Sequence, residues 1–296
     1  MKQRLVPHTD DDPATLSEGA AGEKFRLCTY NIFEGFESGN NERLHFFTDW
    51  AKDLQPDVIG LNEVNGFTQE SLNELARQCG LPYAILRPAK TGFHLGVLSR
   101  HPLEAYDTDE VSLRMWHGLL HVRIVPDNGN AWHLLVTHLT PWEAAQRREE
   151  AQTLARYATS FWQDAPLFLV GDLNSLSPLD KIGHDHDQLA AEVLSQVPKL
   201  RRKFLDDVSA VDYAPINILY DAGFIECPGT RDPTVPTPAN RDDAHAAEMR
   251  LDYILASPKL GASGVFSAAQ TWVVRDDRAG KISDHYPVVM EFPGWL

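Results

Sequence analysis

Two kinds of hydrophobic pattern alternate along the chain. Short runs that are continuously apolar, or in which apolar and polar residues alternate, predict β-strands when Gly, Pro or Asp bounds them. A continuous run is typical of a strand that is buried on both faces. The sequence predicts strands at residues 25–32, 58–64, 83–86, 94–99, 119–125, 131–138, 167–171, 250–256, 271–275 and 286–292.

Apolar residues spaced three or four positions apart predict helices. This spacing occurs at residues 42–54, 69–79 and 141–161, and the last helix is predicted to have Thr140 as its N-cap and Pro141 as its first residue. Residues 175–228 read as a helical insertion with helices at 187–197 and 214–222. The order of elements is not the regular alternation of a doubly wound sheet, so mixed sheets with helices outside are expected, in one α+β domain over residues 24–296. The polar residues 1–23 are expected to be a flexible tail.

Polar side chains appear where several predicted strands end. Asp172 and Asn174 follow the run 167–171, and their spacing of two places both side chains on the same side of an extended chain. Taken alone, the pair could instead start a turn, which Asp and Asn favour. Other polar residues at or near predicted strand ends are Asn31, Glu63, His138, Asp284 and His285.

Asp252 differs from these residues because it lies within a predicted strand. Its neighbours include Leu251 and Ile254. A carboxylate among such residues is costly unless it is paired or hydrogen-bonded. A histidine is the expected partner, and His285 is the candidate.

Composition narrows the function. The formal net charge of −15 disfavours tight, non-specific binding to long nucleic acid. The three scattered cysteines, Cys28, Cys79 and Cys227, show neither zinc-site spacing nor a disulfide framework, so a reduced, cytoplasmic protein is expected. No run reaches the length of a membrane span, residues 1–23 lack the apolar core of a secretory signal, and no pattern indicates a protein partner.

Seven short motifs occur in one order along nearly the whole chain. They are TYNI at 29–32, LNEV at 61–64, GVLSR at 96–100, TH at 137–138, GDLN at 171–174, RLDYI at 250–254 and SDHYPV at 283–288. In this order they resemble the endonuclease/exonuclease/phosphatase superfamily, whose fold is DNase I-like. The resemblance implies a four-layer α/β/β/α sandwich with two mixed β-sheets packed face to face. Asn62 stands where Gln is usual in the family.

The resemblance also implies roles for individual residues. Glu63 and Asn31 would bind Mg²⁺, with Mn²⁺ as an alternative, and Asp284 would be a second carboxylate on the metal side. The catalytic residues would be Asp172, which positions or deprotonates the attacking water, Asn174 and His138 at the phosphate, and His285 held by Asp252.

Elementary chemistry agrees with these roles. A divalent cation offsets the negative charge of a phosphate ester, and Mg²⁺ prefers carboxylate oxygens. An Asp–His pair favours the imidazolium form of the ring, which can act on phosphate near neutral pH. The expected function is therefore a Mg²⁺-dependent phosphoesterase acting on a phosphodiester or phosphomonoester, with a small or lipid-like ester or a short nucleic acid as substrate.

Two alternatives stay open at this point. One is a DNA or RNA nuclease proper, and the other is a non-catalytic binding module with the same fold. The basic run 199–203 is either a charged helix face or a site for substrate phosphate. Aromatic side chains that could stack on a base, but that pack in the core by default, are Phe93, Trp116, His117 and Trp142.

Overall fold

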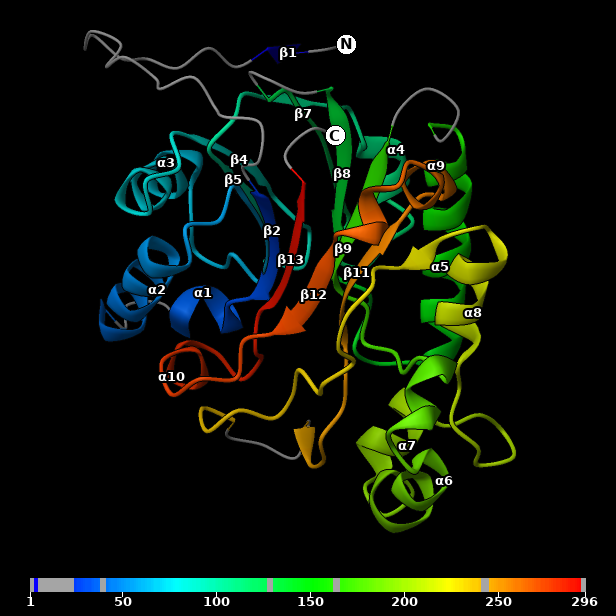
Figure 1. The fold of residues 1–296 in the computed structure, drawn as a ribbon. Coiled ribbons are helices and arrows are strands. Elements are labelled where there is room, and N and C mark those ends of the chain that lie inside the picture. Colours follow the sequence, from blue (N-terminus) through cyan, green and yellow to red (C-terminus); the bar gives the residue numbers. More distant parts are fainter. Residues whose placement is uncertain are drawn as a thin grey trace, which may run out of the picture.

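Two β-sheets pack face to face in the computed structural model, which describes residues 3–4, 24–37, 41–126, 130–161, 166–240 and 245–293. Helices cover the outer face of each sheet, so the layers are helix, sheet, sheet and helix (Figure 1). The four-layer sandwich predicted from the sequence is confirmed. Within the described residues, no helix is long and apolar enough to cross a membrane.

The first sheet has the strand order β12-β13-β2-β3-β5-β4. All its neighbours are antiparallel except β2 and β3, which run parallel. Its strands are β2 (Lys24–Asn31), β3 (Val58–Asn62), β4 (Tyr83–Arg87), β5 (Leu95–Ser99), β12 (Gln270–Val273) and β13 (Val288–Pro293).

The second sheet has the order β1-β6-β7-β8-β9-β11-β10 and again contains one parallel pair, β8 and β9. All six residues of β9 are buried, as the continuous apolar run requires. The strands are β1 (Gln3–Arg4), β6 (Leu103–Ala105), β7 (Leu119–Ile124), β8 (Trp132–Thr137), β9 (Leu167–Asp172), β10 (Ile225–Glu226) and β11 (Asp252–Ala256).

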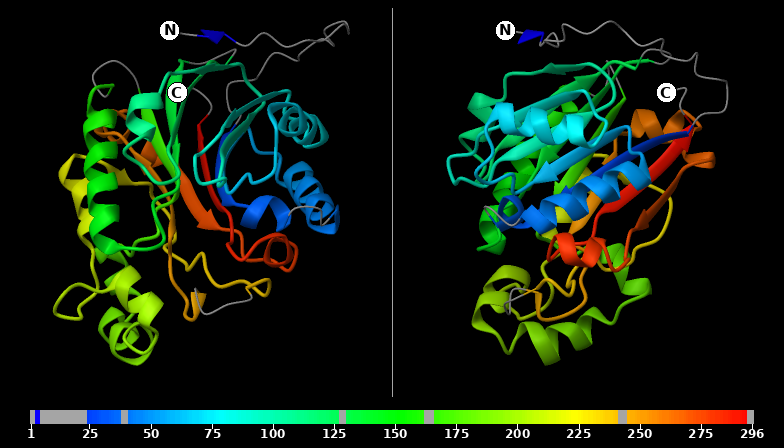
Figure 2. Two further views of the ribbon diagram at one scale, coloured as in Figure 1. Left: turned by 180° about the vertical axis from the view of Figure 1, so that it is seen from behind. Right: turned by 90° about the vertical axis from the view of Figure 1, so that its left-hand side faces the viewer.

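Three apolar clusters follow from this layering. One lies between the sheets and includes Trp132, Phe168 and Phe292. The second packs the outer face of the first sheet against α2 (Asn41–Leu54) and α3 (Gln69–Gln78), and the third packs the second sheet against α5 (Ala144–Thr159) and α8 (Ala214–Asp221). Figure 2 shows the two helical layers on opposite sides of the sheets. The remaining helices are α1 (Phe33–Glu37), α4 (Asp109–Ser112), α6 (His186–Leu189), α7 (Pro198–Phe204), α9 (Pro258–Ala262) and α10 (Ala279–Ile282).

The segment that follows β9 is helical, and its two parts pack differently. Helix α8 joins the outer layer beside α5. Helix α6, the π-helical turn Ala190–Leu194 and α7 instead contribute to a fourth apolar cluster, which includes Leu194, Phe204 and, from the loop before β11, Met249. In Figure 1, α6 and α7 lie beyond the end of the sandwich to which β8 and β9 lead.

Two details differ from the sequence prediction. The helix predicted at 141–161 begins at Ala144, and Thr140 is not its cap. The backbone of Thr140 instead donates to Glu150 Oε2 (2.8 Å) and accepts from Arg147 Nη1 (3.1 Å), so two buried side chains of α5 hold the preceding turn. Asp252 opens β11 and is not inside the strand.

Two further expectations fall largely outside the described residues. Of residues 1–23 only Gln3–Arg4 is described, as a strand paired with β6, so the flexible tail stays a prediction. Between the predicted strands 119–125 and 131–138, the sequence Pro-Asp-Asn-Gly-Asn at 126–130 favours a hairpin turn, but residues 127–129 are also outside the described part. The pairing of β7 with β8 is antiparallel, as a hairpin requires.

Candidate active site

The two parallel strand pairs bring the polar strand ends together. A crossover connection between parallel strands leaves both carboxyl ends at the same edge of a sheet. In the first sheet this edge carries Asn31, the last residue of β2, and Glu63, which follows β3. In the second sheet it carries His138 after β8 and Asp172 at the end of β9. Hydrogen bonds and ion pairs between these residues show that the two edges meet.

Asp252 and His285 form a buried ion pair at this edge. His285 Nδ1 lies 2.7 Å from Asp252 Oδ2, and both residues are almost fully buried. Asp252 pairs directly opposite Asp172 across the β11–β9 ladder. Burial alone would lower the pKa of His285, but the carboxylates of Asp252 and Asp172 outweigh it and raise the pKa to about 10. His285 is therefore an imidazolium at neutral pH.

Asp172 lies at the centre of the site. Its Oδ2 atom is 3.3 Å from Asn31 Nδ2, 3.4 Å from His138 Nε2 and 3.7 Å from His285 Nε2. Its Oδ1 atom accepts a hydrogen bond from the Asn174 backbone N–H at 2.8 Å. The last of the Oδ2 distances is too long for a hydrogen bond, so the imidazolium N–H faces the carboxylate without being bound to it.

Asn174 is held by its own side chain. Its amide nitrogen donates to the Leu139 carbonyl at 2.8 Å, so one of its two N–H groups is used within the protein. Its backbone has φ +47, and that of Glu63 has φ +60. Non-glycine residues in this left-handed region cost about 1–3 kcal/mol each and persist where the surrounding structure enforces them, often at functional sites.

Glu63 and Asn31 form an oxygen-rich pair. Asn31 Nδ2 donates to Glu63 Oε1 (3.1 Å), and the Glu34 backbone N–H donates to Glu63 Oε2 (2.8 Å). Burial, and then the nearby charge of Asp284, raise the pKa of Glu63 to about 7. A divalent cation would relieve this repulsion between the charge of Asp284 and that of Glu63, and the oxygens of the two carboxylates suit Mg²⁺ or Mn²⁺.

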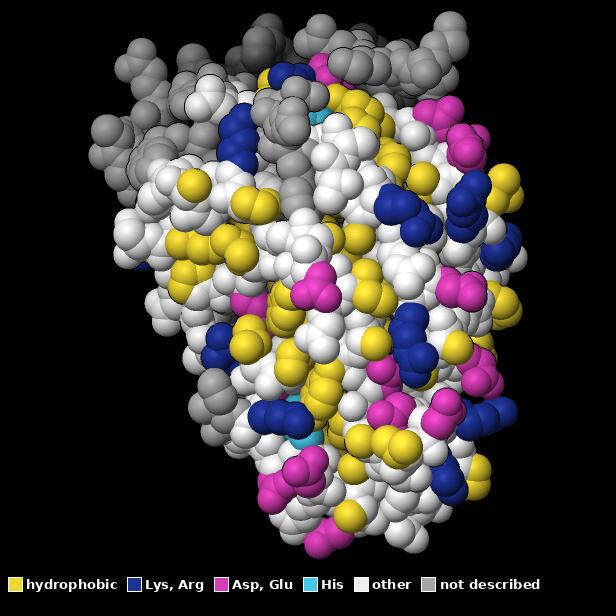
Figure 3. Space-filling view, turned by 90° about the vertical axis from the view of Figure 1, so that its right-hand side faces the viewer, with side chains coloured by type: hydrophobic (Ala, Val, Ile, Leu, Met, Phe, Trp, Pro, Cys, Tyr) yellow, Lys and Arg dark blue, Asp and Glu magenta, His cyan; other side chains and the backbone are white. Residues whose placement is uncertain are grey.

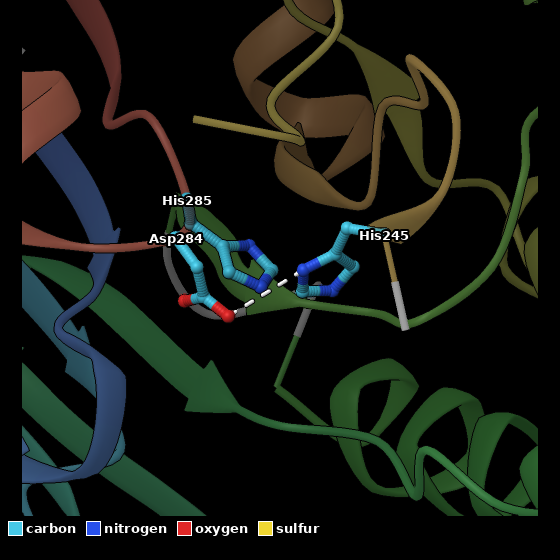
Figure 4. Close-up of side chains that lie close together, drawn as sticks. All are labelled: His245, Asp284 and His285. Atoms are coloured by element: carbon cyan, nitrogen blue, oxygen red, sulfur yellow. Dashed lines mark ion pairs between the residues drawn. The ribbon is translucent and has the colours of Figure 1, made fainter. Parts of the chain in front are cut away.

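His245 lies beside Asp284. Figure 4 shows the His245 ring, carried by the loop before β11, pointing toward the Asp284 carboxylate, with Nδ1 and Oδ2 3.4 Å apart. Burial would raise the pKa of Asp284, but His245 and His285 lower it below its usual range. Two groups of three side chains come close enough to share a cation: His245, Asp284 and His285, and Asp172, Asp252 and His285. Both need His285, whose ring nitrogens carry protons at neutral pH, so the oxygens of Glu63, Asn31 and Asp284 fit a hard cation better.

His138 is supported by a residue behind it. The ring of His117 stacks on that of His138, with centroids 4.3 Å apart, and Thr91 Oγ1 lies 2.8 Å from His117 Nδ1. Burial and the positive charge of His285 lower the pKa of His138 to about 3, so this ring is neutral. The two histidines nearest to Asp172 thus differ in charge, which allows one to act as a cation and the other as a neutral hydrogen-bonding group.

All eight residues singled out in the sequence are therefore brought to one edge of the sandwich. Sequence reasoning did not assign roles to His245 or Asn62, and it left His117 as a core residue by default. The sequence around His245 gives no signal for a functional residue, because this residue lies in a loop in which apolar residues do not recur at regular spacing.

The comparisons with known proteins agree with the fold. Residues 28–285 match the endonuclease/exonuclease/phosphatase family, which is most of the chain. The chain belongs to this family. No curated protein sequence matches it. Members of the endonuclease/exonuclease/phosphatase family are phosphoester hydrolases and are generally metal-dependent.

Solved structures of the family resemble the protein at low sequence identity. The AP endonuclease from Archaeoglobus fulgidus is 17% identical with a TM-score of 0.64, and the match covers 90% of this chain and 99% of that one. The 3′ phosphatase NExo from Neisseria, bound to a product DNA hairpin, is 17% identical with a TM-score of 0.65 and the same coverage. Truncated TDP2 from Caenorhabditis elegans is 16% identical with a TM-score of 0.58, over 92% of this chain and 98% of that one. These similarities show the shared fold.

Proposed function

We propose that the protein is a Mg²⁺-dependent phosphoesterase that hydrolyses a small or lipid-like phosphate ester by in-line attack of water. The observation that carries the proposal is the buried His285, held as an imidazolium between Asp252 and Asp172. A buried cation beside the Asp172 carboxylate offers a donor for phosphate oxygen and an acceptor for a water proton in one place.

Each residue has a distinct task in this proposal. Asp172 orients the attacking water and accepts its proton, since its Oδ2 atom faces the site. His285 donates an N–H to a non-bridging phosphate oxygen, and Asp252 fixes the orientation of its ring. Asn174, through its second N–H, and the neutral His138 bind the phosphate. Glu63, Asn31 and Asp284 hold the metal ion, which supplies charge stabilisation for the phosphoryl oxygens when it is bound.

A nuclease is the second candidate, because the AP endonuclease and the DNA-bound 3′ phosphatase share the fold. The net charge of −15 weighs against long duplex DNA as substrate. On the face in Figure 3, which carries the outer helices α5 and α8, acidic and basic side chains are interspersed. A protein that follows the phosphate backbone would instead need a stripe of basic side chains. The three cysteines of the chain are free, which supports our proposal of a reducing, cytoplasmic location.

A panel of esters tests the proposal. It contains bis-(p-nitrophenyl) phosphate, its monoester, inositol phosphates, sphingomyelin, RNA, and single- and double-stranded DNA, each assayed with Mg²⁺, with Mn²⁺ and with a chelator. Turnover of a small ester that the chelator abolishes, and that Asp172→Asn reduces by about 10²-fold or more, is expected. Preference for DNA with a rate that falls steeply with salt would establish the nuclease reading instead. Absence of turnover with every ester and both metals would overturn the proposal.

A further inference from the structure

Lys203 occupies an inward position of helix α7. Leu200, Lys203 and Phe204 are buried and lie three and four residues apart, so they share one face of the helix. The preceding residues, Arg201 and Arg202, are exposed. Lys203 itself is 3% exposed, and at such a position an apolar residue is the usual choice.

The ammonium group of Lys203 has no counter-ion in contact. Within the described part of the chain, Nζ makes no hydrogen bond and no ion pair, and it lies 4.9 Å from the centroid of the Phe204 ring. A contact with an aromatic face offsets only part of the cost of removing an ammonium from water. Burial accordingly lowers the pKa of Lys203 to about 8. An anion that contacts this ammonium group would therefore stabilise its charged form.

Contacts and charges place Lys203 beside the active site. The guanidinium of Arg147 packs over the same Phe204 ring, 5.9 Å from its centroid, and Arg147 Nε donates to the hydroxyl of Ser175, which follows Asn174. The charges of Asp172 and Asp284 raise the pKa of Lys203, and the charge of Lys203 lowers the pKa of His138. Arg147 already donates hydrogen bonds to the Ser175 hydroxyl and the Thr140 carbonyl, whereas Lys203 donates none to the described residues.

The charge of the site explains what Lys203 would bind. Three buried carboxylates, Asp172, Asp252 and Asp284, and the half-buried Glu63 lie around one imidazolium. Such an environment repels a phosphate group until further positive charge is present. We propose that Lys203 is a substrate-binding residue of this site, whose unpaired, inward-facing ammonium binds a non-bridging oxygen of the substrate phosphate. This inference rests on the proposed phosphoesterase function and assigns to the 175–228 segment a direct contact with substrate.

Three variants test the inference: Lys203→Met, Lys203→Arg and the control Arg202→Met, which removes an exposed charge from the same helix. The dissociation constant of inorganic phosphate is measured by calorimetry, and KM and kcat are measured with whichever ester the panel shows to be turned over. Lys203→Met is expected to weaken phosphate binding and to raise KM by about 10-fold or more, with a smaller change in kcat. Arg202→Met stays within about twofold of the parent protein.

Lys203→Arg gives a second readout. The parent protein should lose phosphate affinity as the pH rises through about 8, where Lys203 loses its proton, whereas Lys203→Arg should keep its affinity at pH 9.5. Thermal stability separates binding from a structural role. Removing a buried ammonium without a counter-ion should raise the Tm of the ligand-free protein in Lys203→Met, while a structural lysine would lower it.

The outcomes distinguish the two proposals. Unchanged phosphate affinity and KM in Lys203→Met, in a parent enzyme that turns over esters, would overturn the role of Lys203 alone. A parent protein that turns over no ester would overturn the phosphoesterase proposal, whatever phosphate binding shows. If Lys203→Met does not fold, the comparison of the parent protein with Lys203→Arg at pH 9.5 decides, and equal loss of affinity in both refutes the role.

Discussion

Replacing Asp252 by Asn tests the electrostatics at the centre of the site. The change keeps the shape of the side chain and removes the charge that lies 2.7 Å from His285 Nδ1. The pKa of His285 is raised from 6.5 to about 10, and this difference corresponds to roughly 5 kcal/mol. After burial, which opposes the shift, Asp252 is its first cause and Asp172 its second. With Asp172 left alone against burial, the pKa of His285 should fall back toward its ordinary value of 6.5.

The consequences appear in rate and stability. At pH 8 the variant would have a neutral imidazole, so kcat should fall by on the order of 10²- to 10⁴-fold, and by less at pH 5.5, where the ring regains its proton. Because the folded-state pKa of His285 is raised, the ion pair stabilises the fold fully below pH 6.5, and this contribution is lost as the pH rises through about 10. The variant should therefore be less stable at pH 7 by about 3–5 kcal/mol.

Two measurements check this reasoning. The imidazole signals of His285 are titrated by NMR in the metal-free protein, and the pH–rate profile is recorded with the best ester of the panel. Asp57→Asn serves as the control, since it breaks the ion pair with Arg100 (3.0 Å) at the other end of β3 and should leave His285 unchanged. A His285 pKa that stays near 10 in Asp252→Asn, or a rate loss equal at pH 5.5 and 8, would refute the argument.

Two further predictions concern residues outside the proposed catalytic set. Gly171→Ala should destabilise the protein by on the order of 3 kcal/mol or more in urea denaturation, because φ is +137 and the new Cβ would lie 1.9 Å from the Thr137 carbonyl oxygen. The control Gly66→Ala, at a residue with φ +75 and open space around it, should cost only about 1–2 kcal/mol. Equal losses of stability in the two variants would contradict this account. Burial and the charge of His133 lower the pKa of His121 to about 3 in the folded protein. Between pH 6.5 and 3 the unfolded chain therefore binds a proton at His121 that the folded protein does not bind, so the free energy of unfolding falls as the pH is lowered through this range. His121→Asn should weaken this dependence by up to about 3 kcal/mol between pH 6.5 and 4, and an unchanged slope in urea titrations would count against it.

Much of the fold could be predicted from the sequence because local pattern and buried environment agree. The run 167–171 becomes a fully buried strand, and the helix predicted at 42–54 forms as α2. The helix start at Thr140 was predicted wrongly, because a capping pattern competes there with contacts to buried side chains seven and ten residues later. Such contacts have no local signature.

The sequence allowed the residues of the candidate site to be predicted, but not their backbone conformations or the positions of their side chains. Residues such as Asp172 and His285 could be singled out because they interrupt apolar runs. The left-handed backbone of Glu63 could not be foreseen, because glutamate rarely adopts that conformation, whereas Asn174 is of a residue type that is enriched there. The inward position of Lys203 also escapes pattern reasoning, since the run 199–203 reads equally well as a solvated helix face.

Asn62 ties the two sheets together at the end that carries the site. Its amide donates to the Thr137 carbonyl and accepts from the Asp172 backbone N–H, each at 2.9 Å, so a single short side chain spans both sheets at their functional end. Sliding of one sheet over the other would break both bonds at once. Asn62 thus holds Asp172 of the second sheet in register with Asn31 and Glu63 of the first, which keeps the general base at a constant distance from the residues proposed to hold the metal ion.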